Sequence, residues 1–73
     1  MTVDEVMDVY CDVLETTGIT PDSDFFALGG DSLLATRVLS AVARRTGIEL
    51  TFDDFLLAPT PNALAKAIES VLA

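Results

Sequence analysis

The stretch Asp24–Leu34, DFFALGGDSLL, decides how this chain folds, because it leads from a loop directly into a helix. Its paired glycines allow a tight backbone turn. Directly after them, either Asp31 or Ser32 can cap the first free N–H groups of a helix. We predict that this helix runs to about Thr46, with Gly47 as its stop. Apolar residues fill one side of it: Leu34, Ala35, Val38, Leu39 and Val42.

Upstream of this stretch, the sequence predicts a first helix from about Val3 to Thr17. Thr2 and Glu5 stand at the spacing of a capping box, and Gly18 suits a left-handed C-cap. Its apolar side chains recur in steps of three and four residues: Val3, Val6, Met7, Tyr10, Val13 and Leu14. The loop that follows contains proline, glycine and large apolar residues, so we expect it to be irregular and to fold back onto the core.

Downstream, the sequence predicts two more helices. One is a short helix within Thr51–Leu57, and the other begins with Thr60 as N-cap and Pro61 in the first position. The apolar face of the last helix is Leu64, Ala65, Ile68, Val71 and Leu72. Strand alternation is weak and no repeat is present. We therefore predict an all-α fold over residues 1–73, a small single-domain four-helix bundle with three main helices and one short helix.

Charge and composition exclude several classes of function. The 73 residues include 12 acidic and 4 basic side chains, so the formal net charge of -8 argues against nucleic acid or an anionic membrane as partner. The charge is uneven: residues 1–31 hold no base, whereas residues 32–48 hold three arginines and no acid. No secretory signal or membrane span is visible, and the single cysteine, Cys11, excludes an intrachain disulfide. These features favour a cytoplasmic protein.

The start of the central helix is the candidate site. A helix N-terminus offers free N–H groups and the positive end of the helix dipole, which favour an anion. The Ser32 hydroxyl is placed to carry a phosphate ester there, whereas the Asp31 carboxylate opposes this field while stabilising the helix. For the stretch alone, an ordinary N-cap is the simpler interpretation.

Two other motifs at this site are weak. The residues 30–33, GDSL, match a hydrolase nucleophile signature, but the chain has no histidine to act as base and is too short for that scaffold. A calcium loop counted from Asp22 fails, because its sixth position is Ala27 and its twelfth is Leu33.

Cys11 flanks the apolar face of the first helix, which favours a small buried side chain over a reactive thiol.

Residues 25–34 resemble the modification site of the phosphopantetheine-dependent carrier proteins, and are most similar to the peptidyl carriers of nonribosomal peptide synthesis. The Ala-Pro-Thr of residues 58–60 also matches, so the resemblance covers nearly the whole chain. It implies an acyl-carrier-like fold and a protein that is not itself an enzyme. A phosphopantetheinyl transferase would attach 4′-phosphopantetheine from coenzyme A to Ser32. The thiol of this arm would hold an aminoacyl or acyl group as a thioester.

The resemblance also implies partners, namely an adenylation or other loading enzyme and condensation or other tailoring enzymes of antibiotic or secondary metabolism. We predict a monomer that contacts these partners through Asp31, Leu33, Arg37 and Phe52. Phe55 and Leu56 extend this surface unless their side chains are needed in the core. Two alternatives remain open, a polyketide-type acyl carrier and an unmodified helical interaction module. The initial methionine and the absence of a linker favour a free-standing carrier over an excised domain.

Overall fold

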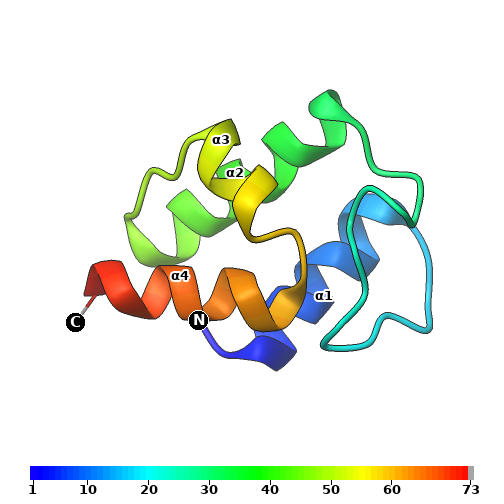
Figure 1. Cartoon of the computed structure of the whole chain (residues 1–73), viewed down its shortest axis with the longest axis horizontal. Helices are drawn as coiled ribbons and strands as arrows, with labels where there is room; N and C mark the ends of the chain where they lie inside the picture. The colour runs from blue at the N-terminus through cyan, green and yellow to red at the C-terminus, as the bar shows by residue number, and fades with distance from the viewer. Residues whose placement is uncertain (73) are drawn as a thin grey trace.

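The computed structural model describes residues 1–72, and it confirms an all-α bundle in which three longer helices and one short helix contain the regular structure (Figure 1). In chain order they are α1 (Val3–Leu14), α2 (Ser32–Thr46), α3 (Phe52–Leu57) and α4 (Pro61–Leu72). Helix α1 packs against both α2 and α4, and α2 packs against α3. The long loop of residues 15–31 lies at the end of the bundle opposite the two termini. None of the helices within residues 1–72 has the length and apolar run needed to cross a bilayer.

Local side-chain hydrogen bonds begin the helices where the sequence predicts. Capping boxes form between Thr2 and Glu5 at α1 and between Thr51 and Asp54 at α3. In each box the backbone N–H of the threonine donates to the carboxylate, which lowers the pKa of Glu5 and of Asp54 below their ordinary values. Thr60 caps α4, since its Oγ1 accepts the N–H of residue 63 at 3.1 Å.

Helix α1 ends three residues earlier than the sequence predicts. Glu15 takes the left-handed conformation with φ 51°, and its N–H donates to the Cys11 carbonyl, so it and not Gly18 is the C-cap. The predicted extension to Thr17 is therefore wrong. Residues 15–17 are one acid and two β-branched threonines, which favour helix only weakly and offer no apolar side chain to the core.

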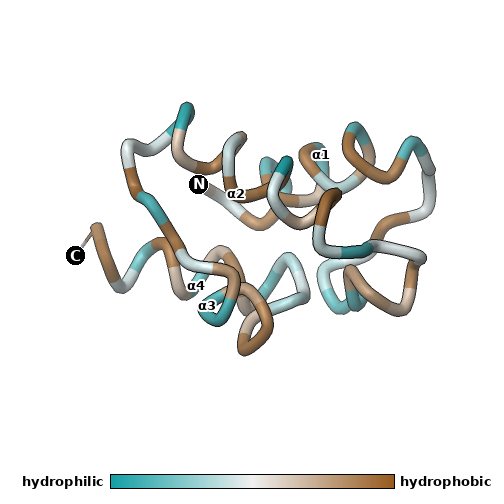
Figure 2. Tube along the Cα trace, turned by 90° about the horizontal axis from the view of Figure 1, so that it is seen from above, coloured by the Kyte–Doolittle hydropathy of each residue, from teal (hydrophilic) through white to brown (hydrophobic). Residues whose placement is uncertain are grey.

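The core draws on all four helices and on the loop. Figure 2 shows apolar and polar segments alternating along the helices, as expected for amphipathic helices around a shared interior. Val9, which the periodicity of α1 did not indicate, is buried because α1 packs against helices on two sides. Val71 and Leu72, by contrast, are exposed, so their assignment to the core face of α4 is wrong. They lie in the last turn of α4, at the edge of the bundle (Figure 1).

The loop folds back onto the core, as predicted, through contacts with the connection between α3 and α4. The carbonyl of Pro59 accepts two hydrogen bonds, from the Phe25 N–H at 3.2 Å and from the Tyr10 hydroxyl at 2.6 Å. The Asn62 N–H donates to the Pro21 carbonyl at 3.0 Å, and the Asn62 side chain donates to the Asp22 carboxylate. These bonds hold the segment that precedes α2 against the rest of the bundle.

Candidate functional site

Ser32 is the first residue of α2, and its side chain is exposed. Asp31, the residue before it, is the N-cap, since its carboxylate accepts the Leu34 N–H at 2.9 Å and its carbonyl accepts the Ala35 N–H at 2.8 Å. The sequence does not decide whether Asp31 or Ser32 is the N-cap of α2, and the structure shows that it is Asp31. The Ser32 hydroxyl is consequently not used for capping, and it has no hydrogen-bond partner within residues 1–72.

The electrostatic surroundings of this hydroxyl favour an anion. The first turn of α2 contains no acidic residue, and the N–H groups of Ser32 and Leu33 have no acceptor in the described part of the chain. The positive end of the α2 dipole therefore faces the hydroxyl, and the Asp31 carboxylate is already engaged as the cap. The free N–H groups and the dipole favour a phosphodiester at Ser32 Oγ, whereas the negative charge of the neighbouring Asp31 carboxylate opposes it.

The two glycines before α2 are needed for different reasons. Gly29 has φ 98°, a conformation that L side chains rarely adopt. Gly30 has no such φ, but a Cβ on it would overlap the Phe25 ring and lie 2.7 Å from the Phe25 carbonyl oxygen. That oxygen accepts the Gly30 N–H at 3.0 Å. The second glycine thus lets the backbone leading to Ser32 pass directly over a buried aromatic ring.

The loop next to the site is held by Asp24 and by a cluster of aromatic rings. The Asp24 carboxylate accepts the N–H groups of residues 26 and 27, which fixes the turn. In the core, the rings of Tyr10 and Phe55 each pack against the ring of Phe25, and both ring centroids lie 5.1 Å from that of Phe25. Burial, reinforced by the negative charge of Asp24, raises the pKa of the Tyr10 phenol well above its ordinary range.

The structure brings only some of the predicted contact residues together. Leu33 is 67% exposed, and together with Arg37 it lines a groove between α1 and α2. Phe52, on α3, is 36% exposed and does not line that groove. Its ring meets the half-buried Phe26 with a centroid distance of 6.3 Å. Phe55 is completely buried, so of the two roles left open for it the structure assigns the core: a bundle of this size needs that ring in its interior.

Sequence reasoning missed the structural role of Pro59. Its carbonyl ties Tyr10 and Phe25 to the α3–α4 connection, and the Ala-Pro-Thr of residues 58–60 stood out only through the resemblance to a family. No local pattern signals a carbonyl that accepts from residues distant in sequence. Among residues 1–72, no cluster of histidine, cysteine or acidic side chains is arranged to hold a metal ion.

Comparison with known proteins identifies the family. The family model described as "Phosphopantetheine attachment site" matches residues 4–68. The chain belongs to this family. As a phosphopantetheine attachment domain, it has phosphopantetheine as its covalent cofactor, and carrier proteins of this kind are generally not catalytic. The exposed Ser32 hydroxyl has no hydrogen-bond partner in the described part of the chain and stands at the start of a helix whose first turn has no acid, which fits attachment of such a group.

Relatives of this attachment domain include nonribosomal peptide synthetases. Pyochelin synthetase PchE of Pseudomonas aeruginosa (strain UCBPP-PA14) is 45% identical over 49 residues, or 67% of the chain. Surfactin synthase subunit 1 of Bacillus subtilis (strain 168) is 33% identical over 69 residues, or 94% of the chain. The chain spans only 3% and 2% of the lengths of these two relatives.

Solved structures of carrier proteins share the fold of this attachment domain. One contains a peptidyl carrier protein with the phosphopantetheine transferase Sfp and coenzyme A. The match has a TM-score of 0.91 and 28% identity, covering 96% of this chain and 91% of that chain. BlmI, a type-II acyl-carrier-protein from Streptomyces verticillus, matches with a TM-score of 0.91 and 22% identity, over 97% of this chain and 86% of that one. The four-helix architecture is therefore that of acyl and peptidyl carriers.

Proposed function

We propose that this chain is a peptidyl carrier domain in which Ser32 bears the 4′-phosphopantetheine arm. The observation that carries the proposal is the Ser32 hydroxyl, which is exposed at the N-terminus of α2 and has no hydrogen-bond partner among residues 1–72. The arm supplies a flexible thiol that holds an aminoacyl group as a thioester. The synthetase relatives favour an aminoacyl cargo, and the proposal treats residues 1–73 as one carrier domain.

Attachment requires Ser32 Oγ to attack the pantetheine-side phosphorus of coenzyme A. A new O–P bond forms, the phosphoanhydride bond breaks, and adenosine 3′,5′-bisphosphate leaves while the hydroxyl proton is lost to a base. This chain contains no histidine, and the neighbouring Asp31 carboxylate is engaged by the Leu34 N–H. We therefore assign the base to the transferase. We infer that the chain contributes position and a favourable field, and that it is not itself an enzyme.

The proposed partners are a phosphopantetheinyl transferase, an adenylation enzyme that loads the thiol, and condensation or tailoring enzymes. A carrier related to this chain has been solved with the first of these, and an adenylation–carrier structure, that of McyG with phenylalanyl-adenylate, is also similar in fold. Asp31, Leu33, Arg37 and Phe52 are the proposed contacts, since all four are exposed. Because attachment of the arm consumes coenzyme A, we place the chain in the cytoplasm.

Substitution of Ser32 tests the proposal. The protein is incubated with coenzyme A and a broad-specificity transferase, and its intact mass is measured. We expect the wild type to gain one phosphopantetheine and Ser32→Ala to gain none. Ser40→Ala is the matched control, because Ser40 is also an exposed serine of α2, and it should be modified like the wild type. No gain on the wild type, or an equal gain on Ser32→Ala, would contradict the proposal and favour an unmodified interaction module.

Leu33→Asp tests the proposed partner surface. We expect its initial rate of modification to fall roughly tenfold, the effect of losing one apolar contact of about 1.4 kcal/mol. Circular dichroism should be unchanged, because the side chain is 67% exposed. Leu57→Asp is the control, since Leu57 is 86% exposed and lies at the end of α3. An unchanged rate for Leu33→Asp would remove Leu33 from the partner surface, and a loss of helix would place it in the core.

A further inference from the structure

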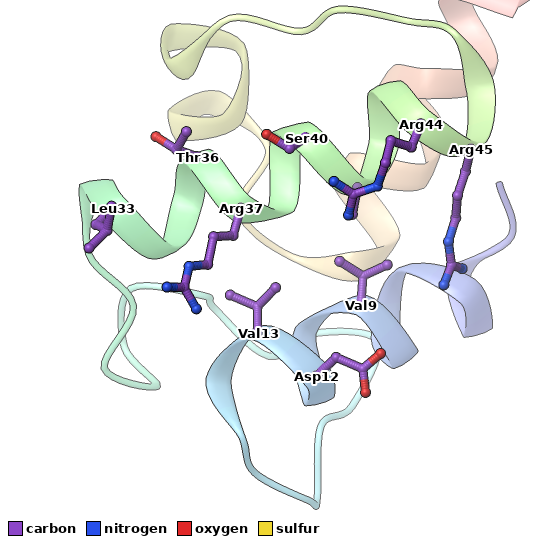
Figure 3. A pocket seen from close by; sticks show the side chains of 10 residues that line it. Val9, Asp12, Val13, Leu33, Thr36, Arg37, Ser40, Arg44 and Arg45 are labelled. Atoms are coloured by element: carbon purple, nitrogen blue, oxygen red, sulfur yellow. The ribbon is translucent and has the colours of Figure 1, made fainter.

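A groove of about 570 Å³ runs between α1 and α2 (Figure 3). Val9 and Val13 of α1 contribute apolar surface to it, and Leu33 of α2 lies at one end. Val9 is buried at the floor of the groove, so the apolar contact area that remains available comes from the half-buried Val13 and the largely exposed Leu33. This surface contains no residue that holds the loop or the aromatic cluster in place.

The two walls of the groove carry opposite charge. Arg37, Arg44 and Arg45 lie along α2, and Asp12 lies on α1. Three of the four basic residues of a chain with a net charge of -8 thus line one wall. None of them forms an ion pair within 4.0 Å of a carboxylate in residues 1–72. The guanidinium groups are therefore available to carboxylates from another molecule.

The spacing of the arginines indicates the shape of that molecule. Arg37 and Arg44 are seven residues apart on a continuous helix, which is about two turns or roughly 10 Å along its axis. One compact anion cannot bridge this separation easily, whereas carboxylates seven residues apart on a second helix repeat it. The apolar surface between the walls suits the apolar stripe of such a helix.

We propose that the α1–α2 groove binds an amphipathic helix of a partner protein. The helix presents acidic residues on the edge that faces Arg37 and Arg44, and basic or uncharged residues on the edge that faces Asp12. Its apolar side chains cover Val13 and Leu33. Opposite charges on the two walls then fix the orientation of the helix. The interaction needs neither the phosphopantetheine arm nor Ser32, so it stands or falls independently of the proposed function.

A designed peptide tests this docking site. The probe is an amphipathic helix with glutamates seven residues apart along one edge, lysines along the other and leucines between them. Its matched control has glutamine in place of glutamate. Titrated into isotopically labelled protein, the probe should shift the amide signals of α1 and α2 around Val13, Leu33 and Arg37. Ser32→Ala should bind it equally well. If inorganic phosphate shifts the same signals as strongly, the groove is an anion site and the proposal is wrong.

Paired variants decide whether the arginines are responsible. Arg37→Gln with Arg44→Gln should weaken binding of the probe by about tenfold or more, as expected for losing close interfacial charge pairs. Lys66 is the one basic residue of the chain that does not line the groove, since it lies on α4. Lys66→Gln should therefore change binding of the probe less than about twofold. Thermal melts confirm that all variants are folded. Equal weakening by both changes would show non-specific attraction, and an absence of saturable binding by the wild type would also overturn the proposal.

Discussion

Large apolar side chains in and around the loop before α2 divide into two groups with opposite surroundings. Tyr10, Phe25 and Phe55 form a completely buried cluster, whereas Leu33 is 67% exposed and Leu28 is 42% exposed. Burial of an apolar surface stabilises a fold by roughly 25 cal/mol per Å², and an exposed leucine contributes this energy only when a partner covers it. The difference separates stability from recognition, since the buried group holds the loop before Ser32 and the exposed group is available for binding.

The largest expected effect distinguishes the two groups by stability. Phe25→Ala should lower the free energy of unfolding by about 3–5 kcal/mol, because it leaves a cavity in the core. Leu33→Ala should change it by less than about 0.5 kcal/mol. Urea unfolding followed by circular dichroism measures both. Because Phe25→Ala removes a whole ring from the core, Phe25→Leu provides a milder variant, which should lose less stability. Similar losses for Phe25→Leu and Leu33→Ala would abolish the distinction.

A smaller effect tests how closely the backbone before Ser32 passes the buried ring. Gly30→Ala should destabilise the domain by roughly 1–3 kcal/mol, because the new methyl group would overlap the Phe25 ring. The loss should shrink when Gly30→Ala is made in the Phe25→Leu background, where the ring is absent. Urea unfolding of the two single variants and the double variant measures this coupling. Additive losses would show that the ring does not constrain Gly30.

The smallest expected effect concerns the hydroxyl of the buried cluster. Tyr10→Phe removes the hydrogen bond to the Pro59 carbonyl and should cost about 1 kcal/mol at neutral pH. The raised pKa of the Tyr10 phenol also gives a pH dependence. Because the unfolded chain loses this proton first, near pH 10, wild-type stability should fall as the pH rises above about 10.

Ultraviolet titration can follow this group directly, since Tyr10 is the single tyrosine and the chain has no tryptophan. Folded protein should form tyrosinate only well above pH 10, and protein in urea at the ordinary pKa of about 10. Tyr10→Phe should lack the additional alkaline loss of stability. Titration of the folded protein at the ordinary value would contradict burial of the hydroxyl.

The boundaries of α2, the capping boxes of α1 and α3 and the start of α4 were all predictable, because each depends on side chains within a few residues of a helix end. The end of α1 was not, since Gly18 is an equally good local signal and only the absence of apolar side chains for the core at residues 15–17 favours Glu15. Periodicity also could not separate Phe55 from Phe52, because a helix of six residues is too short to define one apolar face.

The sequence alone established that Ser32 begins a helix, that acidic residues precede it in the chain and that three arginines follow it. Caps, glycine turns and charge order need no knowledge of distant residues. Packing determined the rest. It joined Tyr10 and Phe25 through the Pro59 carbonyl, and it set the arginines of α2 in one groove with Asp12 of α1. Those contacts link residues far apart in the chain, so they exist only once the helices have docked.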